Sequence, residues 1–63
     1  MITIEYLHHR RTDDKVVECS NTFDTPSKAV RFVYKIIRDK DYCYTGYSCD
    51  TMEETEEMER RLR

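Results

Sequence analysis

The chain has 63 residues and a net charge of −2, so it is long enough for one domain and lacks the strongly basic balance typical of many nucleic-acid-binding domains. A chain this short buries only about 60% of the surface that its unfolded form exposes, which leaves little material for a deep catalytic pocket. Charged and apolar residues each make up 38% of the sequence, a composition that still differs from that of disordered chains.

Two strands are predicted in the first third of the chain. Residues 1–7, MITIEYL, alternate and place Ile2, Ile4 and Tyr6 on one face. Residues 15–23, KVVECSNTF, alternate again after a short polar segment. The pattern therefore indicates a β-hairpin, although no glycine follows the aspartate pair in its turn.

A long amphipathic helix is predicted in residues 25–39, TPSKAVRFVYKIIRD. Thr25 can cap the helix, and Pro26 suits the first helical position because its missing N–H is not needed there. At 100° per residue, six apolar side chains fall within an arc of about 160°. They are Ala29, Val30, Phe32, Val33, Ile36 and Ile37. This face is expected to pack on the core.

A third strand is predicted in residues 41–50, DYCYTGYSCD, which holds three of the five tyrosines and the only glycine. Free cysteine is among the most buried residue types, and this favours one parity for the core. The core-facing residues are then Cys43, Tyr47 and Cys49. The residues expected on the outer face are Tyr42 and Tyr44. A bulge at Gly46 would shift this parity.

An acidic helix is predicted to follow, in residues 51–63. Thr51 and Glu54 have the spacing of a capping box, and acids lead while arginines trail, which complements the helix dipole. Six carboxylates lie within ten residues: Asp50, Glu53, Glu54, Glu56, Glu57 and Glu59. The apolar stripe is narrow and consists of Met52, Met58 and Leu62.

These elements predict a small α+β domain over residues 1–63 with the order ββαβα. A helical crossover would run the third strand parallel to the second. The third strand would then be antiparallel to the first and could pair with it. We therefore expect the strand order 2-1-3, with the long helix on one face of the sheet and the opposite face or the strand edges left for partners.

No motif for catalysis or metal binding is evident. His8 and His9 are adjacent and would point to opposite faces of a strand, and Cys43 and Cys49 lack the spacing of zinc ligands. The chain has no Cys-x-x-Cys pair and no glycine-rich phosphate loop. We expect no enzymatic activity, no metal and no cofactor.

The uneven charge distribution leaves two functions open. The acidic residues of 50–59, with Tyr42 and Tyr44, could bind a larger protein by imitating nucleic-acid phosphates in a basic groove. The residues proposed for this contact are Tyr42, Tyr44, Asp50, Glu53, Glu54, Glu56 and Glu57. A non-enzymatic protein-interaction module of this kind is the leading hypothesis.

The alternative is a small nucleic-acid-binding accessory protein. Its basic side chains would follow a phosphate backbone, with Tyr42 or Tyr44 stacking on bases. The residues proposed for this role are Arg10, Arg11, Lys28, Arg31, Lys35 and Arg38. The acidic C-terminal segment argues against this hypothesis unless the two charges lie on opposite sides of the molecule.

Three features of the sequence favour a cytoplasmic location. No apolar run approaches the length of a membrane span, and the chain does not start with a basic and then apolar leader. Three cysteines are an odd number, which favours reduced thiols. We expect a cytoplasmic protein without membrane contact.

Residues 22–63 resemble the short, mostly uncharacterised early proteins of phages and prophages of Gram-positive bacteria. The resemblance lies in TPSKAVRFVYKIIRD, in GYSCD and in the acidic tail that ends in RRLR. Such proteins often bind one host or viral protein, including as anti-CRISPR or host-takeover inhibitors. The resemblance implies a protein partner but carries over no binding residue.

Overall fold

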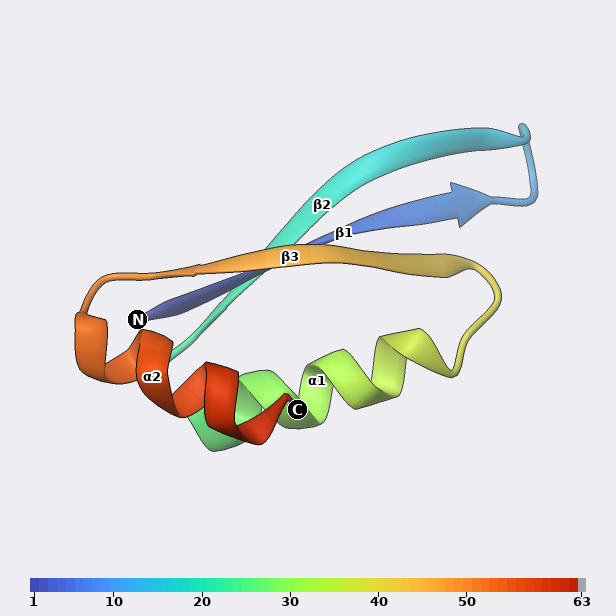
Figure 1. Cartoon of the computed structure of the whole chain (residues 1–63). Helices are drawn as coiled ribbons and strands as arrows, with labels where there is room; N and C mark the ends of the chain where they lie inside the picture. Colours follow the sequence, from blue (N-terminus) through green and yellow to red (C-terminus); the bar gives the residue numbers. More distant parts are fainter. Residues whose placement is uncertain (63) are drawn as a thin grey trace.

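A three-stranded antiparallel sheet and two helices form the fold of residues 1–62, which the computed structural model describes. The elements are β1 (Ile2–Arg10), β2 (Lys15–Phe23), α1 (Pro26–Ile37), β3 (Tyr42–Cys49) and α2 (Met52–Arg61). β1 is central, with β2 and β3 at its sides (Figure 1). The predicted α+β class, the ββαβα order and the strand order 2-1-3 are confirmed. The predicted C-terminal helix extends to Arg63, which lies outside the described residues.

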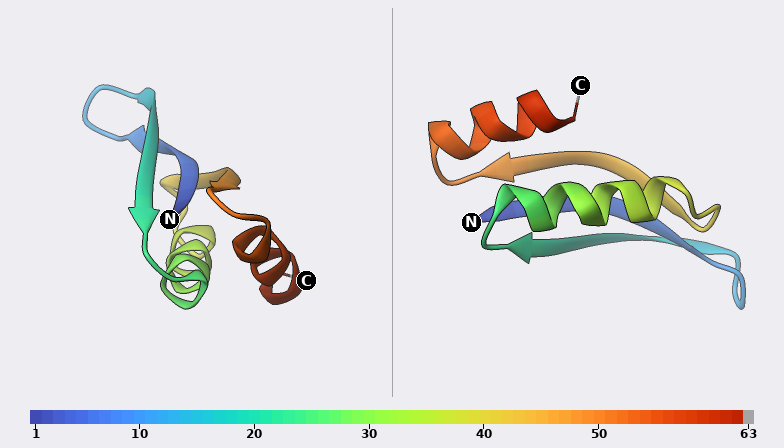
Figure 2. Two further views of the ribbon diagram at one scale, coloured as in Figure 1. Left: turned by 90° about the vertical axis from the view of Figure 1, so that its left-hand side faces the viewer. Right: turned by 90° about the horizontal axis from the view of Figure 1, so that it is seen from below.

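Both helices cover the same face of the sheet, and the other face is open (Figure 2). Seven buried side chains form the core between sheet and helices: Ile2, Ile4, Ala29, Val30, Val33, Ile36 and Met58. The predicted apolar arc of α1 is therefore largely correct. Ile37 is the exception at 54% exposed, and it is the last residue of the helix.

Local capping explains where both helices begin. Lys28 N donates to Thr25 Oγ1 over 3.3 Å, and Pro26 occupies the first turn of α1. Thr51 and Glu54 form the predicted capping box of α2, with each side chain accepting the other residue's backbone N–H. α2 then packs against α1 and β3, with Met58 fully buried. Met52, predicted on the apolar stripe, is 73% exposed.

A register shift in β3 decides which tyrosines meet the core. Glu5 pairs with Gly46 while Tyr6 pairs with Tyr44, so Thr45 is an extra residue on β3. The bulge that Gly46 made conceivable is present, and it reverses the parity of the strand before it.

Tyr42 and Tyr44 consequently lie on the helix side of the sheet and pack against the core. The prediction that they occupy the outer face is wrong, as is the prediction that Cys43 faces the core, since Cys43 is exposed. Tyr47 and Cys49 follow the bulge and pack against the core as predicted.

We expect Val33→Ala to lower the free energy of unfolding by about 1–3 kcal/mol, because Val33 is 2% exposed and alanine would leave a cavity. Arg31→Ala, on the exposed side of α1, should change it by less than about 0.5 kcal/mol. Urea unfolding followed by circular dichroism measures both. Equal costs would contradict this orientation of α1.

Candidate nucleic-acid interface

The acidic residues predicted to bind a partner are only partly available. The amino group of Met1 lies 2.8 Å from Glu54 Oε2 and 3.4 Å from Asp50 Oδ2. The hydrogen bond to this amino group lowers the pKa of Glu54. Glu54 therefore serves the capping box and the chain start, both of them contacts within the fold.

Glu57 is also engaged within α2. Its carboxylate lies 2.6 Å from Arg61 Nε and 3.1 Å from Arg60 Nη1. The hydrogen bond from Arg61 lowers the pKa of Glu57. The two arginines thus neutralise part of the surface that the sequence predicted to be acidic.

Three glutamates of α2 remain exposed and make no ion pair within residues 1–62: Glu53, Glu56 and Glu59. Tyr44, predicted as a contact residue, is half-buried, and burial raises the pKa of its hydroxyl. The predicted acidic and aromatic residues therefore do not form one continuous exposed surface.

Some of the predicted basic residues are likewise paired within the fold. Arg10 lies 2.6 Å from Asp13, and Lys28 lies 3.1 Å from Asp24, which lowers the pKa of Asp24. Arg31 is exposed on α1, one helical turn before Lys35. Arg10 and Lys28 are thus paired with carboxylates of the fold.

Arg11, Lys35 and Arg38 are brought together, and Lys40 joins them. With Asp39 they line an open, shallow hollow of about 490 Å³ at the end of α1. Four cations and one carboxylate line the hollow, and a second carboxylate, that of Asp41, pairs with Arg11 beside it. We call Arg11, Lys35, Arg38 and Lys40 the basic end.

The turn after β1 and the turn after α1 meet to make the basic end. His9 N donates to the carbonyl oxygen of Asp41 over 2.7 Å, and Arg11 Nε donates to Asp41 Oδ1 over 2.8 Å. The bond to Asp41 raises the pKa of Arg11 and holds its guanidinium beside the α1–β3 turn. Lys35, Arg38 and Lys40 make no ion pair within the described part of the chain.

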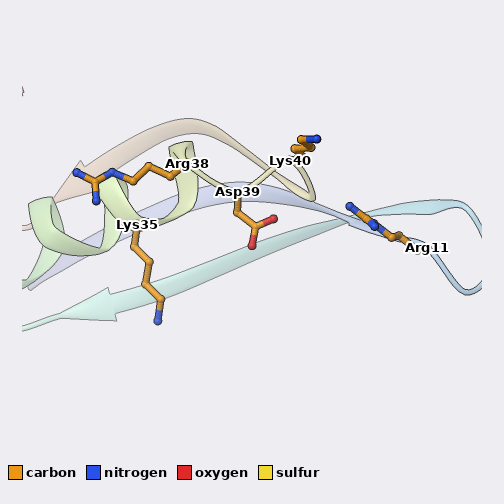
Figure 3. Close-up of a pocket in the computed structure, with 5 residues that line it drawn as sticks. All are labelled: Arg11, Lys35, Arg38, Asp39 and Lys40. Carbon is orange, nitrogen blue, oxygen red and sulfur yellow. The ribbon is translucent and has the colours of Figure 1, made fainter.

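The cations of the basic end fan out around Asp39 and do not converge on one point (Figure 3). Lys35 and Arg38 extend in different directions from α1, while Lys40 and Arg11 lie beyond Asp39. A single small anion would not reach all four. An extended polyanion, whose charges are spaced along a chain, matches this arrangement better.

The basic end and the start of the acidic helix lie at opposite ends of the molecule (Figure 1). The molecule measures 40 Å along its longest axis, several times the Debye length of about 8 Å at physiological ionic strength. An anion at the basic end is therefore largely screened from the carboxylates at the start of α2. This removes the objection that the acidic segment raised against nucleic-acid binding.

Lys40 is the residue of the basic end that the sequence did not single out. It lies between two aspartates and shows no periodicity that would connect it with α1. Its proximity to Arg11 depends on two turns about thirty residues apart. Only a prediction of how those turns pair could have identified it.

Among residues 1–62, no three histidine, cysteine, aspartate or glutamate side chains come together in a group able to hold a metal ion. No helix in the described part of the chain is long and apolar enough to cross a membrane. No family model, curated protein or solved structure matches the chain.

Proposed function

We propose that the protein binds nucleic acid through the basic end and acts as a small accessory protein without catalysis. The observation that carries this proposal is the set of four cations around one shallow hollow, remote from the start of the acidic helix. Three of the four make no ion pair within residues 1–62, so they meet a phosphate without first giving up a partner. The negative net charge does not exclude binding of a polyanion, because the positive charge is concentrated at one end of the molecule.

Binding to a fluorescent oligonucleotide at low salt tests the proposal. The double variant Lys35→Gln, Arg38→Gln should bind at least about 10-fold more weakly, because it loses two cations whose phosphates release counterions. Fluorescence anisotropy measures the affinity, and circular dichroism checks that α1 is intact.

The matched control is the double variant Lys28→Gln, Arg60→Gln. It removes the same charge from two residues that pair with Asp24 and Glu57, outside the basic end. Its affinity should stay within about two-fold of the parent, since distant charges are screened. Equal losses in both variants would show that only net charge matters and would overturn the proposed site.

A second candidate function is an inhibitor that binds a larger nucleic-acid-handling protein, as the resemblance to phage early proteins implies. Glu53, Glu56 and Glu59 support it, because they are exposed and unpaired within the described residues, and the apolar side chain of Met52 is exposed beside them. Such a surface suits a basic groove with an apolar patch. If the parent binds no oligonucleotide at low salt, this candidate replaces the first.

A further inference from the structure

An aromatic crevice of about 200 Å³ adjoins the basic end, between the last turns of α1 and the sheet. Its lining residues are Tyr6, Phe32, Lys35, Ile36, Asp39 and Tyr42. Three of the six are aromatic, and each of these three residues is only partly buried. Lys35 and Asp39 line both the crevice and the basic hollow, so the two are continuous.

The rings of the crevice are held by their neighbours. The ring of Tyr42 stacks on His8, with centroids 4.6 Å apart and planes inclined by 10°. Tyr6 meets Phe32 edge to face at 5.3 Å, and its hydroxyl donates to Asn21 Oδ1 over 3.3 Å. Burial raises the pKa of Tyr6. The crevice is thus pre-formed, and a ligand ring would not have to order it.

The carboxylate of Asp39 separates the cationic hollow from the aromatic crevice. Asp39 lies where the hollow and the crevice meet, and its Oδ1 accepts the backbone N–H of Asp41 over 2.9 Å. A phosphate is repelled from this carboxylate and attracted to the surrounding cations. A neutral ring with N–H groups is not repelled, and the aromatic side chains favour it by stacking.

We propose that the basic end selects single-stranded nucleic acid, with phosphates on its cations and one unstacked base in the aromatic crevice. This rests on the proposed function and adds the form of the ligand. A duplex presents the same phosphates but keeps its bases stacked and paired, so it cannot fill the crevice. Aromatic stacking depends little on base identity, so selection is for the strand form and not for sequence.

The parent protein tests this with four fluorescent ligands of equal length: oligo-thymidylate, oligo-uridylate, a DNA duplex and a strand of abasic residues. The abasic strand keeps the phosphates and lacks the bases. The single strands with bases should bind at least about 10-fold more tightly than the duplex and the abasic strand, which is within the range measured for stacking of one base.

A variant tests whether the base binds in the crevice. Tyr42→Leu keeps an apolar side chain and removes the stacking ring, so it should lower the affinity for oligo-thymidylate to that for the duplex and leave duplex binding unchanged. Tyr34→Leu is the control, because Tyr34 is 41% exposed on α1 and does not line the crevice. It should bind as the parent does.

The outcomes separate this inference from the function on which it rests. Equal binding of the abasic strand, the duplex and oligo-thymidylate would overturn the inference and leave nucleic-acid binding in place. No binding of any ligand at low salt would overturn both. Because the abasic comparison uses the parent protein, it decides the matter even if Tyr42→Leu does not fold.

Discussion

Replacing Met58 by alanine should lower the free energy of unfolding by about 2–5 kcal/mol, the usual range for truncating a buried methionine. Met58 is 0% exposed and is the one fully buried side chain of α2. It fixes α2 against α1 and β3, so its loss leaves a cavity under a helix that has little other apolar surface. In a small domain whose whole stability is a few kcal/mol, this change is large.

Urea unfolding followed by circular dichroism measures the effect, and two variants make the result specific. Met52→Ala should change the stability by less than about 0.5 kcal/mol, because Met52 is 73% exposed. Met58→Leu conserves volume and should cost less than about 1.5 kcal/mol. A Met58→Ala protein as stable as the Met52→Ala protein would show that α2 is not docked as described.

Salt should weaken oligonucleotide binding strongly. With three or four cations on phosphates, the logarithm of affinity should fall with the logarithm of salt with a slope of about −2 to −3, since each phosphate contact on a single strand contributes about 0.7. Raising salt from about 50 to 200 mM then weakens binding about 20- to 50-fold. Titrations at several salt concentrations give the slope.

The slope also identifies the cations. Lys35→Gln, Arg38→Gln should reduce its magnitude by about 1.4, which is two contacts at 0.7 each. Lys28→Gln, Arg60→Gln should leave the slope unchanged, although it alters the net charge equally. An unchanged slope in the first variant would mean that the basic end does not meet phosphates, and a slope near zero in the parent would rule out an electrostatic interface.

Features that depend on neighbouring residues followed from the sequence alone. Thr25 and Pro26 define the start of α1, and the spacing of Thr51 and Glu54 defines the start of α2, because caps are formed within one helical turn. Alternation in β1 placed Ile2 and Ile4 on one face, and both are fully buried. The strand order also followed, since the hairpin and the crossover leave few ways to pair β3.

Features that depend on pairing between distant segments were decided by the tertiary structure. The extra residue at Thr45 moves Tyr42 and Tyr44 to the helix side, because a shift of one residue turns every preceding side chain to the other face. No local propensity distinguishes the two parities when both contain large side chains.

The basic end also depends on pairing between distant segments of the chain. Arg11 and Lys40 come from turns that meet only because β1 pairs with β3 and Arg11 binds Asp41. The acidic helix offers fewer free carboxylates than the sequence suggested. Glu54 pairs with the amino group of Met1, and Glu57 pairs with Arg60 and Arg61. The sequence determined which charges are present. Which of them are neutralised and which remain for a partner depended on distances of a few ångströms, because Coulomb interactions at a protein surface are short-ranged in salt water.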